Sequence, residues 1–320
     1  MARQRGLLPL LSIIKTKKVN KFLNRAIKAK NSYEFPVLKT TGDKSLLFAV
    51  MNGVRNSGKS NTTLCLLEND KDILLGNDAK VWFVSPTADA KVKKFEEDYP
   101  DNFEVIDELT RPNLQNVFNE LKQRFEDWSE IKYVIGLYER WLKNQPLNEL
   151  EEEHLASFNY LEHFDFEDFN EKHPPINTLV IDDSACNPML SQIQSRDGKF
   201  FTSFAIRHRH PPFCCNLIIL TQHIKLISKP LRVNCNLIVV FPFRDASIYH
   251  NVFQEYSTLF NNDINLFLDV MKQIEDRNDH SHLTIYYDGK RFVRINWNEE
   301  IVFAKGKAKA IEDTPNSSEK

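Results

Sequence analysis

The amino-acid sequence predicts an α/β fold in which helices flank a mainly parallel core sheet of five strands. Five short, continuous apolar runs are spaced along the chain, as expected for strands that are buried on both faces of a parallel sheet. Segments with helical periodicity separate several of these runs, and a glycine-containing loop joins the first run to a helix. Together these features are typical of a sheet built from strand–helix–strand units.

The first half of the chain supplies two core strands and a helical region. A strand is expected at residues 45–51, followed at once by the glycine loop at 53–60 and a helix that starts from Ser60. A second strand at 81–85 ends at Pro86 and completes a βαβ unit. Between residues 102 and 144 the apolar residues recur at helical spacing, which predicts two or three helices.

The second half supplies the other three core strands, at residues 177–181, 216–220 and 236–241. Two amphipathic helices follow at about 246–256 and 262–275, and then a β-hairpin with strands at 283–287 and 291–295. We divide the chain into a basic arm (1–33), a core (34–245) with an insertion at about 102–173, a C-terminal helix and hairpin region (246–304), and a disordered tail (305–320).

Composition narrows the class of protein. The chain has 320 residues, 42% of them hydrophobic and 27% charged, which is enough for a soluble domain with a substantial core. No apolar run approaches the roughly 18 residues of a membrane-spanning helix, so we do not expect a membrane span. The five cysteines include no CxxC pair and are odd in number, which favours reduced thiols in an intracellular compartment.

The net charge of −2 conceals two segments of opposite sign. Residues 1–33 contain nine Lys or Arg and no acid; this arm superficially resembles a targeting segment, but no small-residue cleavage site is obvious. A solvated tail or a contact with DNA phosphates is favoured, and the candidate contacts are Lys15, Lys17, Lys18 and Lys21. Residues 147–173 are densely acidic and are expected to form either a solvated lid, which is favoured, or a partner-binding element.

The loop at residues 53–60 has the form GxxxxGK[ST], whose backbone N–H groups curl around the phosphates of a nucleotide. Lys59 is expected to reach the β- and γ-phosphate oxygens, and the Ser60 hydroxyl to be a ligand of Mg²⁺. The predicted nucleotide contacts are Gly53, Val54, Arg55, Asn56, Ser57, Gly58, Lys59, Ser60 and Asn61.

Two acids follow the third core strand. In a phosphate-binding fold of this kind a carboxylate at the end of a neighbouring strand holds the metal, which predicts Asp182 as a Mg²⁺ ligand. Asp183 would then polarise the attacking water as the general base. The alternative is that the two acids only cap a following helix.

Two further features are candidate parts of the same site. Gln222 follows the fourth core strand, where it could sense the γ-phosphate, although it could equally be an ordinary polar strand end. Residues 206–212 place Arg207, His208, Arg209 and His210 before two prolines at the end of a predicted helix. These cations could complement the helix dipole, or Arg207 or Arg209 could act on the γ-phosphate of a neighbouring subunit, with Arg232 as a third candidate.

The ordered set of these motifs resembles the genome-packaging ATPases of large double-stranded DNA viruses and virophages, poxvirus-like in type, within the FtsK–HerA superfamily of P-loop NTPases. The resemblance spans residues 46–243. The residues that carry it are the glycine loop, the strand and turn at 82–87, Ile181-Asp182-Asp183, the Arg-His cluster, Thr221-Gln222, and residues 230–234.

This resemblance implies a P-loop ATPase with core strand order 5-1-4-3-2, counted along the chain, that uses ATP and Mg²⁺ to move DNA. It also implies a homo-oligomeric ring, a pentamer or hexamer, around duplex DNA, a capsid or portal partner, and action at the virion assembly site of an infected cell. Lys59, Ser60, Asp182, Asp183 and Gln222 carry over as site residues, with Arg207 or Arg209 as the arginine that acts in trans.

The chain also departs from this pattern. Many relatives have Glu where this chain has Asp183, and the acidic insertion has no obvious counterpart. About 75 residues follow the last core strand, so we expect a motor without an appended nuclease. Other functions remain open: a cellular HerA-like translocase or helicase partner, a P-loop kinase or regulatory NTPase that does not act on DNA, and an interaction protein that holds nucleotide as a structural ligand.

Overall fold

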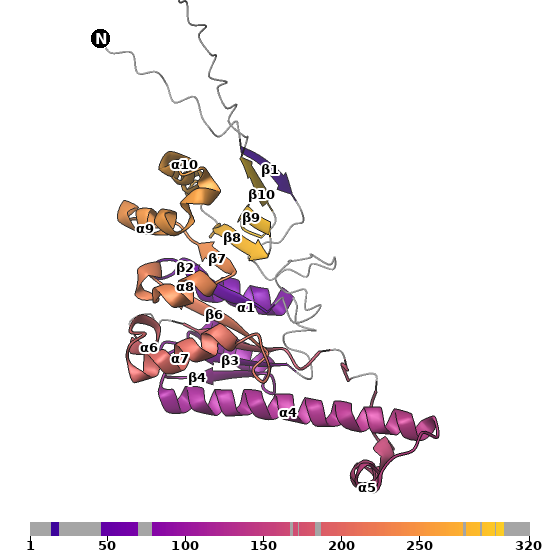
Figure 1. The fold of residues 1–320 in the computed structure, drawn as a ribbon. Coiled ribbons are helices and arrows are strands. Elements are labelled where there is room, and N and C mark those ends of the chain that lie inside the picture. Colours follow the sequence, from indigo (N-terminus) through magenta and orange to yellow (C-terminus); the bar gives the residue numbers. More distant parts are fainter. Residues whose placement is uncertain are drawn as a thin grey trace, which may run out of the picture.

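The computed structural model describes residues 14–18, 46–69, 79–166, 169–171, 173–182, 187–277, 280–288, 290–297 and 299–303. Six parallel strands form the centre of its sheet: β2 (Phe48–Asn52), β3 (Lys80–Val84), β4 (Phe103–Ile106), β5 (Asn177–Ile181), β6 (Cys215–Thr221) and β7 (Leu237–Val240). Their order across the sheet is β7-β2-β6-β5-β3-β4 (Figure 1). The first five of these are the predicted core strands in the order 5-1-4-3-2, so the expected α/β fold is confirmed.

Four antiparallel strands extend the sheet beyond β7. They are β8 (Leu283–Asp288), β9 (Lys290–Ile295), β10 (Glu299–Phe303) and β1 (Ile14–Lys18), which complete a ten-stranded sheet in the order β1-β10-β9-β8-β7. The pair β8 and β9 confirms the predicted hairpin. The sequence did not predict β10 or the N-terminal β1, which pair with each other at the sheet edge.

Helices cover both faces of the sheet. On one face, α1 (Lys59–Asn69) and α3 (Ala90–Asp98) pack on alternate strand residues such as Ala49 and Met51. The intervening residues Phe48 and Val50 face the opposite layer. The helices of that layer are the start of α4 (Arg111–Leu142), α6 (Pro188–Ser191), α7 (Arg196–Arg207), α8 (Lys229–Asn234), α9 (Ala246–Tyr256) and α10 (Ile264–Glu275).

The region predicted as two or three helices is different in the structure. It begins with the short strand β4 and continues as one helix of 32 residues, α4. Thr110 caps the helix by accepting a hydrogen bond from the N–H of Asn113, and Pro112 follows in the first turn. No proline interrupts the helix after that turn, and a single Gly136 is tolerated, so nothing in the sequence breaks it.

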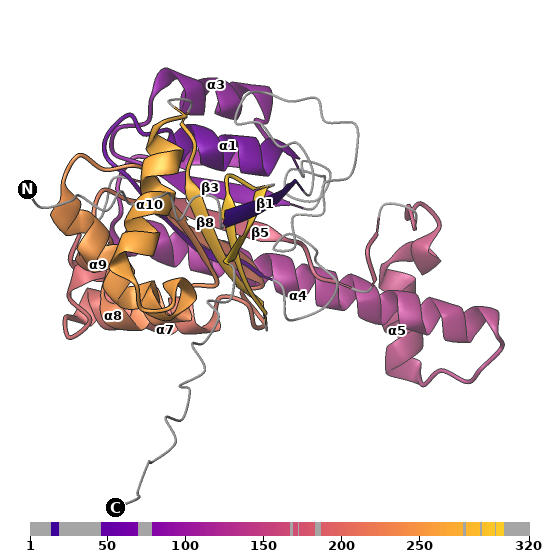
Figure 2. The same ribbon diagram turned by 90° about the horizontal axis from the view of Figure 1, so that it is seen from above.

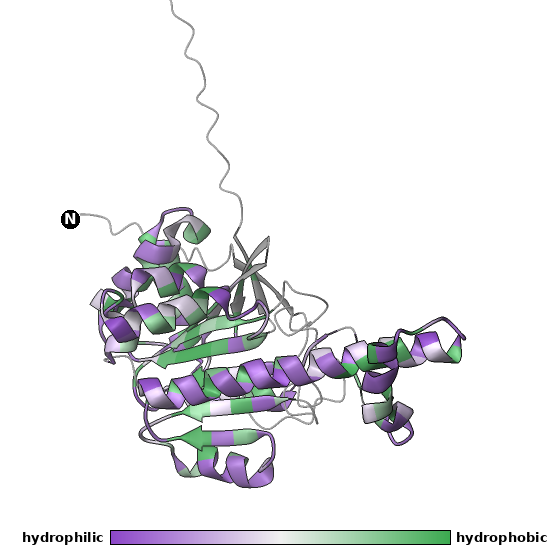
Figure 3. Cartoon of the chain, turned by 60° about the horizontal axis from the view of Figure 1, so that its bottom comes forward, coloured by the Kyte–Doolittle hydropathy of each residue, from purple (hydrophilic) through white to green (hydrophobic). Residues whose placement is uncertain are grey.

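The second half of α4 and α5 (Glu149–Ser157) form a helical projection, residues 131–166, that extends away from the sheet (Figure 2). It has a small core of its own, made of Val134, Ile135, Leu137, Leu155 and Leu161. In Figure 3 the core strands are largely hydrophobic whereas α4 is largely hydrophilic. Among the described residues, no helix has both the length and the apolar character to span a membrane.

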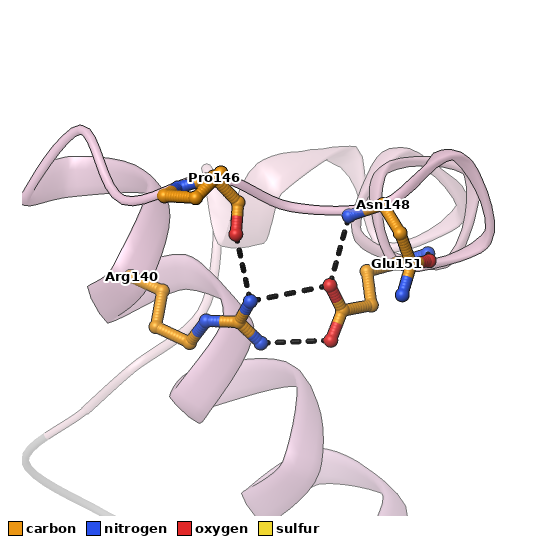
Figure 4. A network of polar contacts seen from close by, with 4 residues as sticks. All are labelled: Arg140, Pro146, Asn148 and Glu151. Carbon is orange, nitrogen blue, oxygen red and sulfur yellow. Dashed lines mark hydrogen bonds and ion pairs between the residues drawn. The ribbon is translucent and has the colours of Figure 1, made fainter.

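A polar network fastens α5 to α4 inside the projection (Figure 4). Arg140 donates from its two terminal nitrogens to the two carboxylate oxygens of Glu151, at 2.7 and 3.2 Å, and also to the Pro146 carbonyl at 2.8 Å. Glu151 also accepts from the Asn148 N–H at 2.9 Å, which completes a capping box at the start of α5. The hydrogen bonds from Arg140 lower the pKa of Glu151. The acidic insertion is therefore an ordered helix pair over these residues.

Candidate nucleotide-binding site

The predicted site residues meet at the carboxyl edge of the parallel sheet because each follows a neighbouring strand. Asn52, the last residue of β2, lies between Thr221 of β6 and Val240 of β7 in the register. The Gly53 N–H then donates to the Thr221 carbonyl at 3.0 Å, and the Asp182 N–H donates to the Val84 carbonyl at 2.8 Å. The strand register thus fixes where the loop begins and where Asp182 leaves β5.

The glycine loop has the backbone conformation that its residues favour. Asn56 and Gly58 both have positive φ angles, 61° and 105°. A Cβ on Gly53 would collide with the Ser57 hydroxyl and lie 2.8 Å from the Phe241 Cβ. The close approach of the loop to β7 therefore requires glycine at position 53.

Lys59 lies within the curve of this loop. Its side chain is buried, and its ammonium donates to the carbonyls of Gly53 at 2.8 Å and Val54 at 2.9 Å. A buried cation needs such partners because it has lost its water. Lys59 begins α1, so its charge and the positive end of the helix lie at the same point. This arrangement favours an anion.

Ser60 and Asp182 are in direct contact. The Ser60 hydroxyl donates to a carboxylate oxygen of Asp182 at 2.8 Å, although 122 positions separate the two residues in the sequence. Hydroxyl and carboxylate oxygens are ligands that Mg²⁺ prefers. The structure brings together the two residues that the sequence predicted as metal ligands.

Two buried polar groups near the loop have no hydrogen-bond partner among the described residues. They are the side-chain amide of Asn52 and the hydroxyl of Ser57. Buried polar groups are almost always paired in a folded protein, so unpaired ones near a binding loop are expected to have a ligand-dependent role. With Lys59, the start of α1, and the Ser60–Asp182 pair, these residues fit a nucleotide phosphate with a divalent cation.

One of the other predicted residues, Gln222, lies at this edge. Gln222 directly follows β6 and is exposed, next to the residue whose carbonyl accepts from Gly53. Asp183 lies outside the described residues. The roles of Gln222 as sensor and of Asp183 as general base stay predictions.

The Arg-His cluster lies at the opposite edge of the sheet. It precedes β6, and the His208 ring packs edge-on against Phe48 at the start of β2, with 5.6 Å between ring centroids. The five residues of β2 span roughly 16 Å, so Arg207 and Arg209 are about that far from the loop of their own chain. Any contact between these arginines and a γ-phosphate would need a second copy of the chain.

His208 was predicted to be one of the cations of this cluster, and the structure shows that this prediction is wrong. His208 is buried, and its Nδ1 donates to the Cys215 carbonyl at 2.5 Å. Burial lowers the pKa of His208 to about 4, so the ring is neutral at pH 7. His208 is a core residue.

Arg232 also makes its side-chain contacts within its own chain. Its guanidinium is buried and makes a 2.7 Å ion pair with Glu255 as well as a hydrogen bond to the Ile227 carbonyl. These contacts tie α8 to α9. Because Arg232 is held in this way, Arg207 and Arg209, which are exposed, are the better candidates for a contact with a neighbouring subunit.

His280, which no sequence motif indicates, also lies at the loop. Its Nδ1 lies 3.2 Å from the Ser57 carbonyl, and its side-chain atoms, the nearest of them at 3.4 Å, lie closest to the position that a Gly58 Cβ would take. His280 comes just before β8, which is antiparallel to β7 and therefore starts at the carboxyl edge. The sequence predicts the hairpin but not that it pairs with the last core strand, and only that pairing would have placed His280 at the loop.

Comparisons with known proteins give a likeness of fold. A family model described as a protein of unknown function, DUF3627, matches residues 84–133, from the end of β3 into α4. No curated protein matches the chain. Among solved structures, the DNA-packaging ATPase B204 of Sulfolobus turreted icosahedral virus aligns at 12% identity and a TM-score of 0.44, over 77% of this chain and 95% of that one.

Two other solved structures align in a similar way. The pCW3 conjugation coupling protein TcpA does so at 16% identity and a TM-score of 0.40, over 82% of this chain and 62% of that one. EssC from Geobacillus thermodenitrificans, in a structure of its ATPases 2 and 3, gives 13% identity and a TM-score of 0.39, over 81% and 39% of the two chains. Identities and scores this low do not establish a shared activity. The nucleotide site rests on the contacts described above.

Proposed function

We propose that this chain is an ATPase that hydrolyses Mg·ATP at the carboxyl edge of its sheet and uses the energy to move duplex DNA, as the motor that packages a viral genome into a capsid. The observation that carries the ATPase proposal is the 2.8 Å hydrogen bond between Ser60 and Asp182 beside the buried Lys59. Two adjacent loop residues, Lys59 and Ser60, lie with Asp182 from 122 positions further along the chain, and phosphoryl transfer uses residues of these types.

Each residue has a stated part in this proposal. When bound, Mg·ATP supplies the phosphoryl group that is transferred to water. Lys59 offsets negative charge on the β- and γ-phosphates, and Ser60 and Asp182 hold the metal. Asp183 orients and deprotonates the attacking water, and Gln222 detects the γ-phosphate.

The assembly part of the proposal depends on the position of the Arg-His cluster. Arg207 and Arg209 are exposed at the edge opposite to the loop of their own chain. An arginine that acts in phosphoryl transfer must reach the γ-phosphate, so a second copy must present its loop to these residues. A homo-oligomeric ring, a pentamer or hexamer around the duplex, satisfies this requirement, and a capsid or portal vertex is its proposed partner.

The DNA part of the proposal is supported by the ordered set of motifs and by the core strand order that the resemblance implied. Other P-loop proteins also have a loop of this kind, and a kinase or regulatory NTPase would use the same Lys59 without acting on DNA. The two functions differ in whether duplex DNA changes the rate of hydrolysis.

The test is the steady-state ATPase rate of the full chain with and without saturating duplex DNA, together with its oligomeric state in the presence of ATP. We expect hydrolysis that rises with duplex DNA and a ring-sized assembly. The motor proposal would be contradicted if duplex DNA left the rate of hydrolysis unchanged and the chain stayed monomeric at micromolar concentration with ATP. Absence of hydrolysis under all conditions would contradict the ATPase as well.

A further inference from the structure

A groove between α4 and α7 carries an unusual concentration of positive charge. It has a volume of about 380 Å³, and none of its lining residues is acidic. The cations that line it are Arg111, Lys122, Arg196, Lys199 and Arg207. Because like charges repel, five cations around one groove favour a polyanionic ligand, although Arg111 also pairs with Asp197 beside the groove.

The cations form two rows. Arg111 and Lys122 are 11 residues apart on α4, and so are Arg196 and Arg207 on α7. At the rise of an α-helix, each row spans roughly 16 Å. The ion pair between Arg111 and Asp197, at 3.5 Å, places the first turns of the two helices together, so the rows run in the same direction. The charge is therefore spread along the groove and is not focused on one point.

The floor of the groove is aromatic. The Phe118 ring stacks on Phe204, with 4.1 Å between centroids and 21° between planes, and on Phe200 at 5.1 Å and 30°. Arg111 lies over the Phe200 ring at 4.9 Å, and Arg207 over Phe213 at 5.7 Å. These rings already stack on one another and on the guanidinium groups. The floor therefore holds the cations in position and leaves little ring surface for stacking with bases.

From these contacts we infer that the α4/α7 groove binds the sugar–phosphate backbone of duplex DNA. Because Arg207 then faces the DNA, Arg209 is the arginine that would act on the γ-phosphate of a neighbouring subunit. This inference rests on the proposed function and adds the surface that holds the substrate. One strand of duplex DNA carries one phosphate for about every 3.4 Å of helix axis and winds around that axis, so a row of about 16 Å can face more than one successive phosphate. Two rows of Lys and Arg match a repeating chain of phosphates better than they match a single small anion.

One wall of the groove also lies close to the nucleotide site in the sequence. The helices α6 and α7 are the next ones in the chain after Asp182. The helices α4 and α7 follow β4 and β5 respectively, so Arg111 and Arg196 lie near the carboxyl edge and Arg207 lies near the opposite edge.

The test compares two double variants of equal charge change. Lys122→Ala with Lys199→Ala removes two exposed cations from the groove, whereas Lys93→Ala with Lys94→Ala removes two exposed cations from α3 on the other face of the sheet. Neither pair belongs to the nucleotide site. Affinity for a labelled duplex is measured by fluorescence anisotropy over a series of salt concentrations, and basal ATPase activity reports that each variant is folded.

Losing two phosphate contacts reduces the magnitude of the slope of log K against log salt by about 1.8. If the two chains bind equally at 1 M salt, the variant then binds about 60-fold more weakly at 0.1 M. We expect this for the groove variant with duplexes of any sequence, and almost no change for the α3 variant. Duplex DNA should also protect Lys122 and Lys199 from acetylation, while Lys93 and Lys94 continue to react.

Three results would overturn the inference. In the first, the wild-type chain binds duplex DNA and the groove variant keeps the same slope, so the DNA lies elsewhere and the proposed function stands. In the second, the groove variant keeps its DNA affinity but loses its oligomeric state, so the groove receives another protein surface such as the acidic projection of a second copy. In the third, the wild-type chain binds no duplex, and the proposed DNA function fails as well.

Discussion

The sheet and the helical projection are held together in different ways. At the nucleotide edge of the sheet, Ser60 contacts Asp182 across 122 positions of sequence, and their placement depends on the register of β2, β6, β5 and β3. In the projection, Arg140 contacts Glu151 across 11 positions, and a cluster of a few apolar side chains supports the pair. The first region depends on the whole fold, whereas the second depends on local contacts.

This difference predicts how far the effect of a substitution extends through the structure. A change at the nucleotide edge disturbs groups that several strands position together, so it should affect activity strongly even where it leaves the chain folded. A change in the projection should stay within α4 and α5, because few contacts connect the projection to the sheet. The following substitutions test that distinction, beginning with the largest expected effect.

Asp182→Asn should have the largest effect. The amide keeps the size of the side chain but loses the charge that holds the metal, so we expect kcat for ATP hydrolysis to fall at least about 100-fold. Hydrolysis and the melting temperature are measured on the same preparation. Unchanged turnover in a folded variant would show that the contact with Ser60 is only structural.

His208 tests the opposite edge of the sheet. Its folded pKa of about 4 lies below the ordinary value of 6.5, so the unfolded chain takes up a proton first as the pH falls. The contribution of neutral His208 to the free energy of unfolding is therefore fully present above pH 6.5. It is lost progressively between pH 6.5 and about 4, by roughly 3 kcal/mol in total. Urea unfolding across this range should show that His208→Gln, which keeps a hydrogen-bond donor and has no titrating ring, loses less stability than the wild type.

The carboxylates titrate in both chains, so the difference between the two curves isolates the histidine. Parallel curves would mean that the pKa of His208 is the same in the folded and the unfolded chain, and would contradict the lowering that its burial against Phe48 predicts.

Two glycines give a matched comparison between the regions. A Cβ at Gly53 would collide with Ser57 and approach Phe241, so Gly53→Ala should cost about 1–3 kcal/mol of stability and weaken ATP binding. Gly136 has nothing within 4 Å of its potential Cβ and lies in the interior of α4, so Gly136→Ala should stabilise the chain by about 0.5–1 kcal/mol. Unfolding by urea measures both. If both substitutions raised or both lowered the free energy of unfolding, the contrast between a tightly packed Gly53 and an open Gly136 would be wrong.

Arg140→Ala should have the smallest effect. It removes the bidentate contact with Glu151 and the bond to Pro146, both at partly exposed positions. Hydrogen exchange should show faster exchange in α5, while the melting temperature shifts by about 2 °C or less because exposed ion pairs contribute little. Lys143→Ala, which removes the exposed pair with Glu139 on the same helix, is the control. Faster exchange in β2 or β5 after Arg140→Ala would contradict the independence of the two regions.

The predictable parts of the fold were those with strong local signals. The five core strands are continuous apolar runs, and the glycine loop and Asp182 follow two of them, so both the elements and the contact at the site could be expected. The strand β4 has only four residues, of which only Phe103 is fully buried, and its short pattern could not be separated from the helix that follows. The pairing of β1 with β10 joins the two ends of the described chain, and no local pattern reports such a distant partner.

The site was harder to predict where burial changes the chemistry of a side chain. His208 and Arg232 look like surface cations in the sequence, yet one is neutral in the core and the other is paired with Glu255. The Arg207 side chain belongs to a groove whose other wall is 85 or more positions away in the sequence, so the groove could not be predicted from residues 206–212 alone. His280 reaches the loop only through the antiparallel pairing of β8 with β7.

The most direct test of the central claim is the rate of Mg²⁺-dependent ATP hydrolysis by the wild-type chain and by Lys59→Ala, measured side by side with their melting temperatures. Lys59 is the buried cation inside the loop, so its loss should remove the charge that offsets the phosphates. We predict that the wild-type chain hydrolyses ATP and that the folded variant does so at least about 100-fold more slowly. Equal rates in the two chains, or no hydrolysis by the wild type, would contradict the account.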